Sequence, residues 1–161
     1  MPQLTPLRRT IALVALAFGG FGIGVTEFAS MGLLPDIARD LLPRFDANPE
    51  QEIARAGMVI TAYALGVVIG APTVAVLAAR ASHTTLTWVL LVMFMCGSLA
   101  SAAATSFEML LVCRLIAALP HGGYFGVASL IAARIMGPGS QGKGVALALS
   151  GLTIANIVGV P

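Results

Sequence analysis

Apolar residues in this chain are gathered into long blocks, and the charged residues lie between the blocks. Four stretches carry no formal charge: residues 56–79, 81–107, 115–133 and 144–161. A further apolar stretch near the N-terminus contains one acid, Glu27. An α-helix needs about 20 residues to cross the ~30 Å hydrocarbon core of a bilayer. The pattern therefore predicts helices that cross a membrane.

We expect five spans, with approximate bounds 11–34, 57–79, 86–104, 109–135 and 144–161, the last truncated by the end of the chain. Backbone polar groups in hydrocarbon must bond within the protein, and barrel strands would be about half as long and apolar on one face only. The predicted fold class is an all-α membrane protein, a polytopic transmembrane helix bundle.

Composition agrees with this fold class and narrows the function. Hydrophobic residues make up 58% and charged residues 10%, against roughly 45–50% and about 25% in ordinary globular chains. The basic residues are scattered, so we expect no nucleic-acid partner. Cys96 and Cys113 lie in apolar blocks without metal-ligand spacing, and we expect small buried hydrophobic residues there. We predict no metal site and no cofactor.

The distribution of charge favours an N-terminus on the inside of the membrane. The apolar run after Arg8 and Arg9 continues far beyond the length of a signal peptide, which indicates an uncleaved first span. The connection 35–56 holds three arginines diluted by five acids and is expected outside. Within it, Asn48 followed by Pro49 predicts the start of a helix. The basic residues expected inside are Arg8, Arg9, Arg80, Arg134 and Lys143.

Small residues recur at four-residue spacing within the predicted spans, as Gly20 with Gly24, Gly66 with Gly70, and Gly122 with Gly126. In lipid this spacing lets helix backbones approach one another closely, because lipid supplies no hydrophobic drive for helix association. The spacing predicts a packed bundle and does not indicate a substrate.

Ionisable residues inside spans are stronger functional candidates, because a charge in the bilayer is costly and normally faces a bundle interior or a wet cavity. Glu27 lies in the first predicted span, and Arg114 and His121 lie seven residues apart on one face of the fourth. Pro120 removes a helical hydrogen bond just before His121. Two interpretations stand open: a proton- or substrate-binding site, or a structural Glu27–Arg114 pair beside a hydrogen-bonded His121.

One motif in the chain does not indicate function. Residues 137–142 fit the pattern GxGxxG, but no predicted strand precedes them and no βαβ unit surrounds them. A membrane-embedded enzyme is also disfavoured, because a single histidine within the spans supplies no metal or nucleophile constellation. We therefore expect a connecting loop at 137–142 and no enzymatic activity.

Four stretches of the chain carry a resemblance to a known family. Residues 22–38 contain GIGVTEF and GLLPDIA, residues 63–72 read YALGVVIGAP, residues 114–126 read RLIAALPHGGYFG, and residues 151–161 read GLTIANIVGVP. In combination they resemble the major facilitator superfamily, in particular its arabinose-efflux-permease-like drug:proton antiporters. The resemblance implies helix-motif and gating roles for Gly66, Gly70, Pro72, Arg80, Pro120, Gly122, Gly126, Gly151, Asn156 and Gly159.

The chain departs from the family pattern at two places. In the loop after the second span, Leu77 and Arg80 match, but Ala79 stands in place of an acid and His83 begins the segment where a basic pair is usual. These changes remove charges from the family's cytoplasmic latch. In the fifth span, Asn156 stands within the segment where the family has Gly-Pro.

The resemblance implies the first five helices of a major-facilitator-type fold, as a partial N-terminal six-helix half that covers 1–161. It also implies a multi-pass protein of the bacterial inner membrane that exports a small organic compound, of drug or sugar type, in exchange for protons by alternating access. Its expected partners are the lipid bilayer, the substrate, protons and the missing C-terminal half of the same transporter. The cavity residues would be Glu27, Arg114 and His121. The alternative is a small self-contained membrane bundle that acts as an oligomeric or scaffold subunit.

Overall fold

The structure is a computed structural model that describes residues 5–79 and 81–159. Every regular element in these residues is an α-helix, which confirms the predicted all-α class. The helices are α1 (Pro6–Gly32), α2 (Leu34–Leu41), α3 (Pro49–Ala56), α4 (Met58–Ala78), α5 (His83–Ala102), α6 (Phe107–Met136) and α7 (Gln141–Val158).

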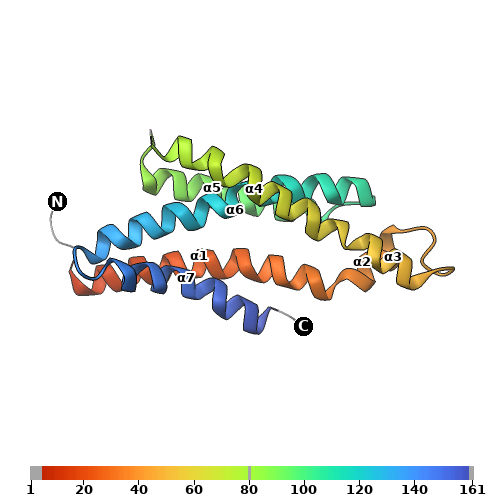
Figure 1. Ribbon diagram of the computed structural model, residues 1–161, viewed down its shortest axis with the longest axis horizontal. Coiled ribbons are helices and arrows are strands. Elements are labelled where there is room, and N and C mark those ends of the chain that lie inside the picture. Colours follow the sequence, from red (N-terminus) through yellow and green to blue (C-terminus); the bar gives the residue numbers. More distant parts are fainter. Residues whose placement is uncertain (1–4, 80, 160–161) are drawn as a thin grey trace.

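The long helices run along the long axis of the molecule in two groups (Figure 1). Helix α6 packs against both α4 and α5, and α1 packs chiefly against α7. Contacts of α6 with α7, and weaker contacts of α6 with α1, join the two groups. Helix α6 is therefore the element around which the bundle is organised, and its α1-facing side is only partly covered.

Within residues 5–79 and 81–159, four helical segments are long and apolar enough to cross a membrane: Pro6–Gly32, Pro49–Ala78, His83–Ala102 and Phe107–Met136. Large apolar side chains on these segments point outward, among them Phe18, which is 69% exposed, and Trp88, which is 67% exposed. Exposed apolar surface of this extent indicates contact with lipid or with another membrane segment. Helix α7 is not one of the four; it includes the polar residues Gln141, Lys143 and Asn156.

Three of the long helices begin earlier than the apolar pattern alone predicts, because polar residues cap them. The hydroxyls of Thr5, Ser82 and Ser106 each accept the backbone N–H three residues later, at 3.4, 3.2 and 3.2 Å. Such caps satisfy N–H groups that have no partner within the helix. The caps place the starts of α1, α5 and α6 outside the most apolar stretches.

The connection 35–56 is largely helical. Helix α3 begins at Pro49 as expected, but Gly57 separates it from α4, and Asn48 at the N-cap position makes no side-chain capping bond. Apolar residues pack α2 and α3 against the starts of α4 and α6. This cluster comprises Ala38, Leu42, Ala56, Val59, Phe107 and Leu110. It closes one end of the bundle, which we call the α2–α3 end.

The prediction of two buried cysteines fails at Cys96. Cys96 is exposed and Cys113 is only partly buried, and both are free. The expectation of two buried residues is wrong for Cys96, because α5 packs mainly against α6 and leaves its other faces uncovered. An apolar block identifies a span but does not identify which side of the helix faces the bundle.

Candidate functional site

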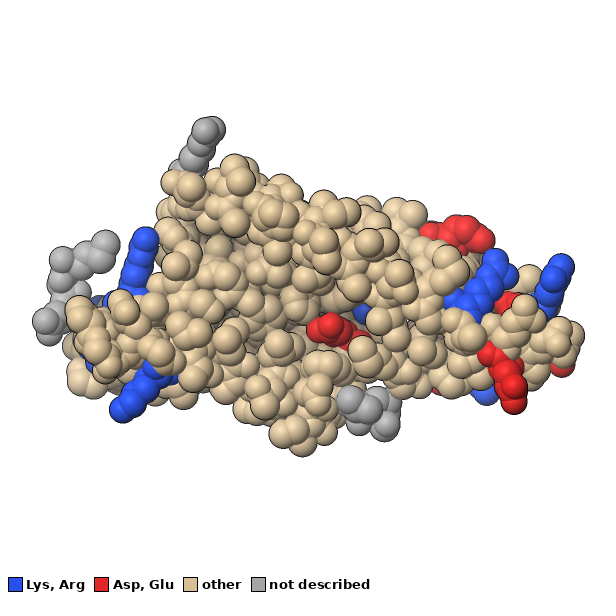
Figure 2. Space-filling model, in the orientation of Figure 1, with Lys and Arg blue, Asp and Glu red and all other residues tan. Residues whose placement is uncertain are grey.

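A cavity of about 270 Å³ lies between α1, α4 and α6. Its polar lining consists of Glu27 from α1, Tyr63 from α4, and Arg114 and His121 from α6; the rest of its lining is apolar. Charged side chains gather at the two ends of the molecule, and one acidic spot with basic atoms beside it interrupts the uncharged belt between them (Figure 2). The structure thus brings together the three residues that the sequence singled out and adds Tyr63.

His121 is the centre of this group. Its Nδ1 lies 2.8 Å from the hydroxyl of Tyr63 and 3.8 Å from Oε2 of Glu27. Its ring also packs against Phe125, with 5.1 Å between the ring centroids. Only one hydrogen can lie on Nδ1, so Tyr63 donates to His121 in one tautomer and accepts from it in the other. Glu27 approaches the same nitrogen, so a carboxylate lies beside the hydrogen bond between Tyr63 and His121.

Arg114 is 4% exposed and faces the ring of Tyr63, with its guanidinium carbon 4.4 Å from the ring centroid. Such an arrangement is a cation–π contact. In residues 5–79 and 81–159 no carboxylate oxygen lies within 4.0 Å of the guanidinium, and Nε is buried without a hydrogen-bond partner. The direct Glu27–Arg114 pair considered from the sequence is therefore not present; Tyr63 and His121 connect the two charges.

Close contact between α4 and α6 sets this geometry. A Cβ atom at Gly66 would collide with the carbonyl oxygen of Leu115, and one at Gly70 would collide with the backbone of Leu119. Without side chains at these two positions, the helix backbones touch. Tyr63, one turn before Gly66, then reaches the side chains of α6 that flank the contact. The predicted small-residue contact is thus the element that positions the site.

The other glycines with proposed helix-motif roles differ in what they contact. A Cβ at Gly122 would lie 2.8 Å from Cβ of Ala71, whereas one at Gly126 would meet nothing within 4 Å. A Cβ at Gly151 would collide with the carbonyl oxygen of Ala17 on α1, and one at Gly159 would lie 3.3 Å from Cα of Val25. Within the described part of the chain, Gly126 therefore makes no close approach to another helix, contrary to the spacing argument.

The remaining candidates fall in three places. Helices α4 and α6 continue through Pro72 and Pro120, of which Pro72 is exposed and Pro120 is buried. Asn156 lies on an exposed side of α7, away from the cavity. Arg80 lies outside the residues that the structure describes.

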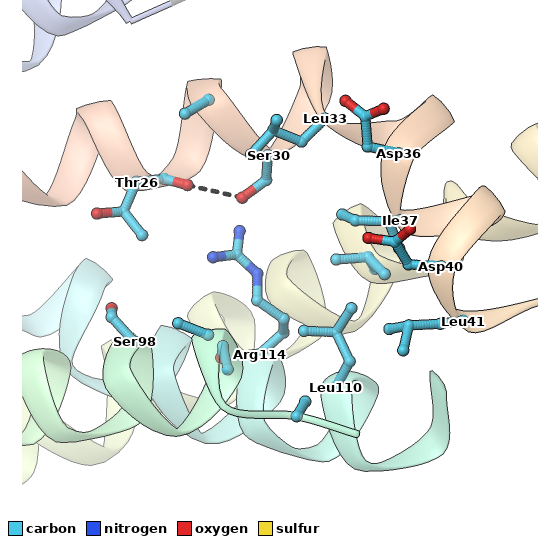
Figure 3. Close-up of a pocket in the computed structure, with 15 residues that line it drawn as sticks. Thr26, Ser30, Leu33, Asp36, Ile37, Asp40, Leu41, Ser98, Leu110 and Arg114 are labelled. Atoms are coloured by element: carbon cyan, nitrogen blue, oxygen red, sulfur yellow. Dashed lines mark hydrogen bonds between the residues drawn. The ribbon is translucent and has the colours of Figure 1, made fainter. Parts of the chain in front are cut away.

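A second, larger cavity of about 450 Å³ lies on the other side of Arg114, towards the α2–α3 end. Its polar lining includes hydroxyl groups from α1 and α5 and the carboxylates of Asp36 and Asp40. Figure 3 shows the guanidinium of Arg114 pointing into this space, towards Ser30 on α1. Arg114 therefore lines both cavities.

Sequence reasoning missed Tyr63 as a site residue. The signal was available, since a tyrosine buried within a span needs a partner for its hydroxyl, and His121 is a buried polar residue of another span. What the sequence lacks is the information that α4 lies against α6, and only the fold supplies it.

Comparisons with known proteins agree with this architecture. Residues 16–161 match the family model described as Major Facilitator Superfamily. The chain is 42% identical over 149 residues to the inner membrane transport protein YdhP of Escherichia coli and 36% identical over 149 residues to the putative transporter AraJ of that species. It is 35% identical over 151 residues to a chloramphenicol resistance protein of Streptomyces lividans. These matches cover 92–94% of this chain but 36% of each relative. No solved structure matches the chain.

Proposed function

The chain belongs to the major facilitator superfamily, and we propose that the protein containing it exports a small organic compound in exchange for protons. The observation that carries the proposal is the group Glu27, Tyr63, Arg114 and His121 at one cavity between α1, α4 and α6. Support for export comes from the chloramphenicol resistance protein among its relatives. The chain spans about a third of the length of these relatives, so the proposal concerns the full-length protein.

Glu27 is the proton-carrying residue in this proposal. Its side chain is 28% exposed, so water reaches it while the cavity is open. Closing the cavity around an ionised carboxylate would be costly because the charge would lose its solvation, whereas a protonated carboxyl closes at lower cost. Protonation of Glu27 therefore favours the closed form. Release of this proton on the other side of the membrane returns the transporter to its open form. This cycle is alternating access driven by protons.

Tyr63 and His121 make the carboxylate of Glu27 responsive to its surroundings. When Nδ1 of His121 carries a hydrogen, the ring offers that hydrogen towards Tyr63 and Glu27; when it does not, Tyr63 donates to the ring. Gain or loss of a proton by Glu27 thus changes which hydrogen bonds the cavity wall makes. Because Arg114 stacks on Tyr63, a change at Glu27 is transmitted to the wall of the second cavity.

The experiment that tests this function uses the full-length protein in liposomes, with chloramphenicol as the first test compound and an imposed pH gradient. In Glu27→Gln the amide keeps the shape and cannot titrate, so uphill transport driven by protons should be lost while downhill equilibration continues. Glu108→Gln is the matched control, because Glu108 is exposed at the start of α6. Uphill transport by Glu27→Gln at the wild-type rate, with unchanged pH dependence, would remove Glu27 from this role, and His121 would be the next candidate.

We further propose that the protein lies in the bacterial inner membrane with its N-terminus inside. Figure 2 shows only basic side chains at one end of the molecule and both signs at the other, and short cytoplasmic connections are the ones enriched in Lys and Arg. After Cys96 and Cys113 are replaced by alanine, cysteines at Asn48 and Ser106 should react with an impermeant thiol reagent added to intact cells. A cysteine at Ser82 should react only after the membrane is opened. The reverse pattern would invert the orientation.

A further inference from the structure

The guanidinium of Arg114 lacks a charged partner in the described part of the chain. It is 4% exposed, and the face that does not contact Tyr63 points into the 450 Å³ cavity (Figure 3). A buried charge without a partner is strongly destabilising. Of the two acids that line this cavity, Asp36 binds Arg39 at 2.9 Å, and neither Asp36 nor Asp40 forms an ion pair with Arg114. Arg114 therefore presents a guanidinium to this cavity without an ion-pair partner among the described residues.

The hydroxyl groups in the cavity wall are possible hydrogen-bond donors to a ligand that binds Arg114. The hydroxyls of Thr26, Ser30 and Ser101 each donate to a backbone carbonyl of their own helix, at 3.0, 2.7 and 2.9 Å. These three hydroxyl hydrogens are therefore not available to a ligand. The hydroxyl of Ser98 is buried and has no hydrogen-bond partner among the described residues. Among the described residues that line this cavity, Arg114 and Ser98 are therefore the two side chains with donor groups that have no hydrogen-bond partner.

A guanidinium and one hydroxyl hydrogen match the two oxygens of a carboxylate, since Arg binds carboxylates through parallel N–H···O bonds. We propose that the cavity bounded by Arg114 and Ser98 binds the carboxylate group of a small organic monocarboxylate. This assignment rests on the proposed transport function and names the substrate class of its binding site. It goes beyond the proton-carrying role of Glu27, which lies in the neighbouring cavity.

The rest of the cavity fits the body of such a compound. Its volume is within the range of roughly 300–1,000 Å³ typical of small-molecule sites. Ile37, Leu41 and Leu110 supply apolar wall for an aryl or alkyl group. Asp36 and Asp40, on the α2 side of the cavity, disfavour a second negative charge on the ligand. The expected order of affinity is therefore monocarboxylate above dicarboxylate, and either above a neutral analogue of the same shape.

The test measures equilibrium binding by titration calorimetry of the full-length protein in detergent, at fixed pH. The probes are benzoate, its neutral analogue benzamide, and terephthalate, which carries a second carboxylate. Wild type should bind benzoate measurably, terephthalate more weakly and benzamide least. Arg114→Gln should weaken benzoate binding about 10- to 100-fold, as expected for loss of a charged hydrogen bond. Arg134→Gln, at the far end of the same helix, should leave it unchanged.

Ser98→Ala keeps the test decisive even if Arg114 variants fold poorly. It removes a buried hydroxyl that has no partner, so it should leave the melting temperature equal or higher. Benzoate affinity should nevertheless fall about 3- to 10-fold through loss of one donor. Equal binding of benzoate and benzamide, or a Ser98→Ala variant with unchanged affinity, would overturn the proposal.

Two further arms separate this proposal from its alternatives. A repeat of the titration in the presence of phosphatidylglycerol distinguishes a soluble carboxylate from a lipid phosphate. Undiminished benzoate binding supports the proposal, and complete displacement by the lipid at low mole fraction overturns it in favour of a lipid site. Benzoate binding is measured at equilibrium without a pH gradient, whereas proton coupling is measured as uphill transport, so failure of carboxylate binding and failure of proton coupling are separately visible.

Discussion

Residues 107–121 of α6 line cavities that contain charged groups, whereas residues 122–136 line an apolar cavity without any. In the first half, Nε of Arg114 is buried without a hydrogen-bond partner among the described residues, and Nδ1 of His121 lies 2.8 Å from the Tyr63 hydroxyl and 3.8 Å from Oε2 of Glu27. In the second half, Tyr124, Ile131 and Ile135 line an apolar cavity of about 320 Å³ with no Asp, Glu, Lys, Arg or His in its described wall. One helix thus lines cavities with charged walls along its first half and an apolar cavity along its second.

The two buried tyrosines, Tyr124 and Tyr63, differ in the partner of their hydroxyl group. Tyr124 donates to the backbone carbonyl of Leu16 at 2.7 Å, which fastens α6 to α1 and leaves no proton to exchange. Tyr63 bonds instead to Nδ1 of His121, a side-chain nitrogen that donates in one tautomer and accepts in the other. The same residue type therefore bonds to a fixed backbone carbonyl at one position and to the side chain of a proposed site residue at the other.

The largest effect is expected at the contact that positions the first half of α6. In Gly70→Leu the new side chain would collide with the backbone of Leu119, so α4 and α6 must separate. We expect a destabilisation of about 3 kcal/mol, at the upper end of overpacking costs, together with loss of transport. The melting temperature of the full-length protein in detergent measures the effect.

Gly126→Ala is the matched control for that change, because its Cβ would meet nothing within 4 Å. It should leave the melting temperature within error and transport intact. A Gly70→Leu protein as stable and active as Gly126→Ala would show that the α4–α6 contact does not determine the site.

Removal of each tyrosine hydroxyl should have a smaller effect, on stability at Tyr124 and on the pH dependence of transport at Tyr63. Tyr124→Phe should lower stability by about 0.5–1.5 kcal/mol, the net contribution of a hydrogen bond, and leave the pH profile of transport unchanged. Tyr63→Phe should shift that pH profile, because Nδ1 of His121 loses its nearer partner. Unfolding curves and transport measured across pH separate the two. Equal pH profiles for both variants would contradict the division of α6 into a site and a structural half.

The sequence predicts the long apolar helices and three of the residues that meet at the cavity between α1, α4 and α6, because each of these predictions rests on a strong local energy. Long uncharged blocks must lie in the bilayer, and the spacing of Arg114 and His121 places both on one face of a helix. The cost of a charge in a span likewise identifies Glu27. These features require no knowledge of which helices are neighbours.

The remainder depends on tertiary packing, which a spacing pattern does not contain. Gly122 and Gly126 share a motif, yet only Gly122 faces another helix closely. Cys96 lies in an apolar block but on an uncovered side of α5. Arg114 stacks on Tyr63 and does not pair with Glu27, because α4 packs closely against α6. The pattern of charges along the sequence does not show which helices are neighbours.

The most direct test of the proposed proton-exchanging group is infrared difference spectroscopy of the full-length protein as a function of pH. We predict a carboxylic acid C=O band that is absent from Glu27→Gln. The titration midpoint of this band should move in Tyr63→Phe but not in Tyr124→Phe. Two results would contradict the claim that Glu27, Tyr63 and His121 act as one group. One is identical spectra of wild type and Glu27→Gln at every pH, and the other is a titration midpoint that is the same in Tyr63→Phe as in wild type.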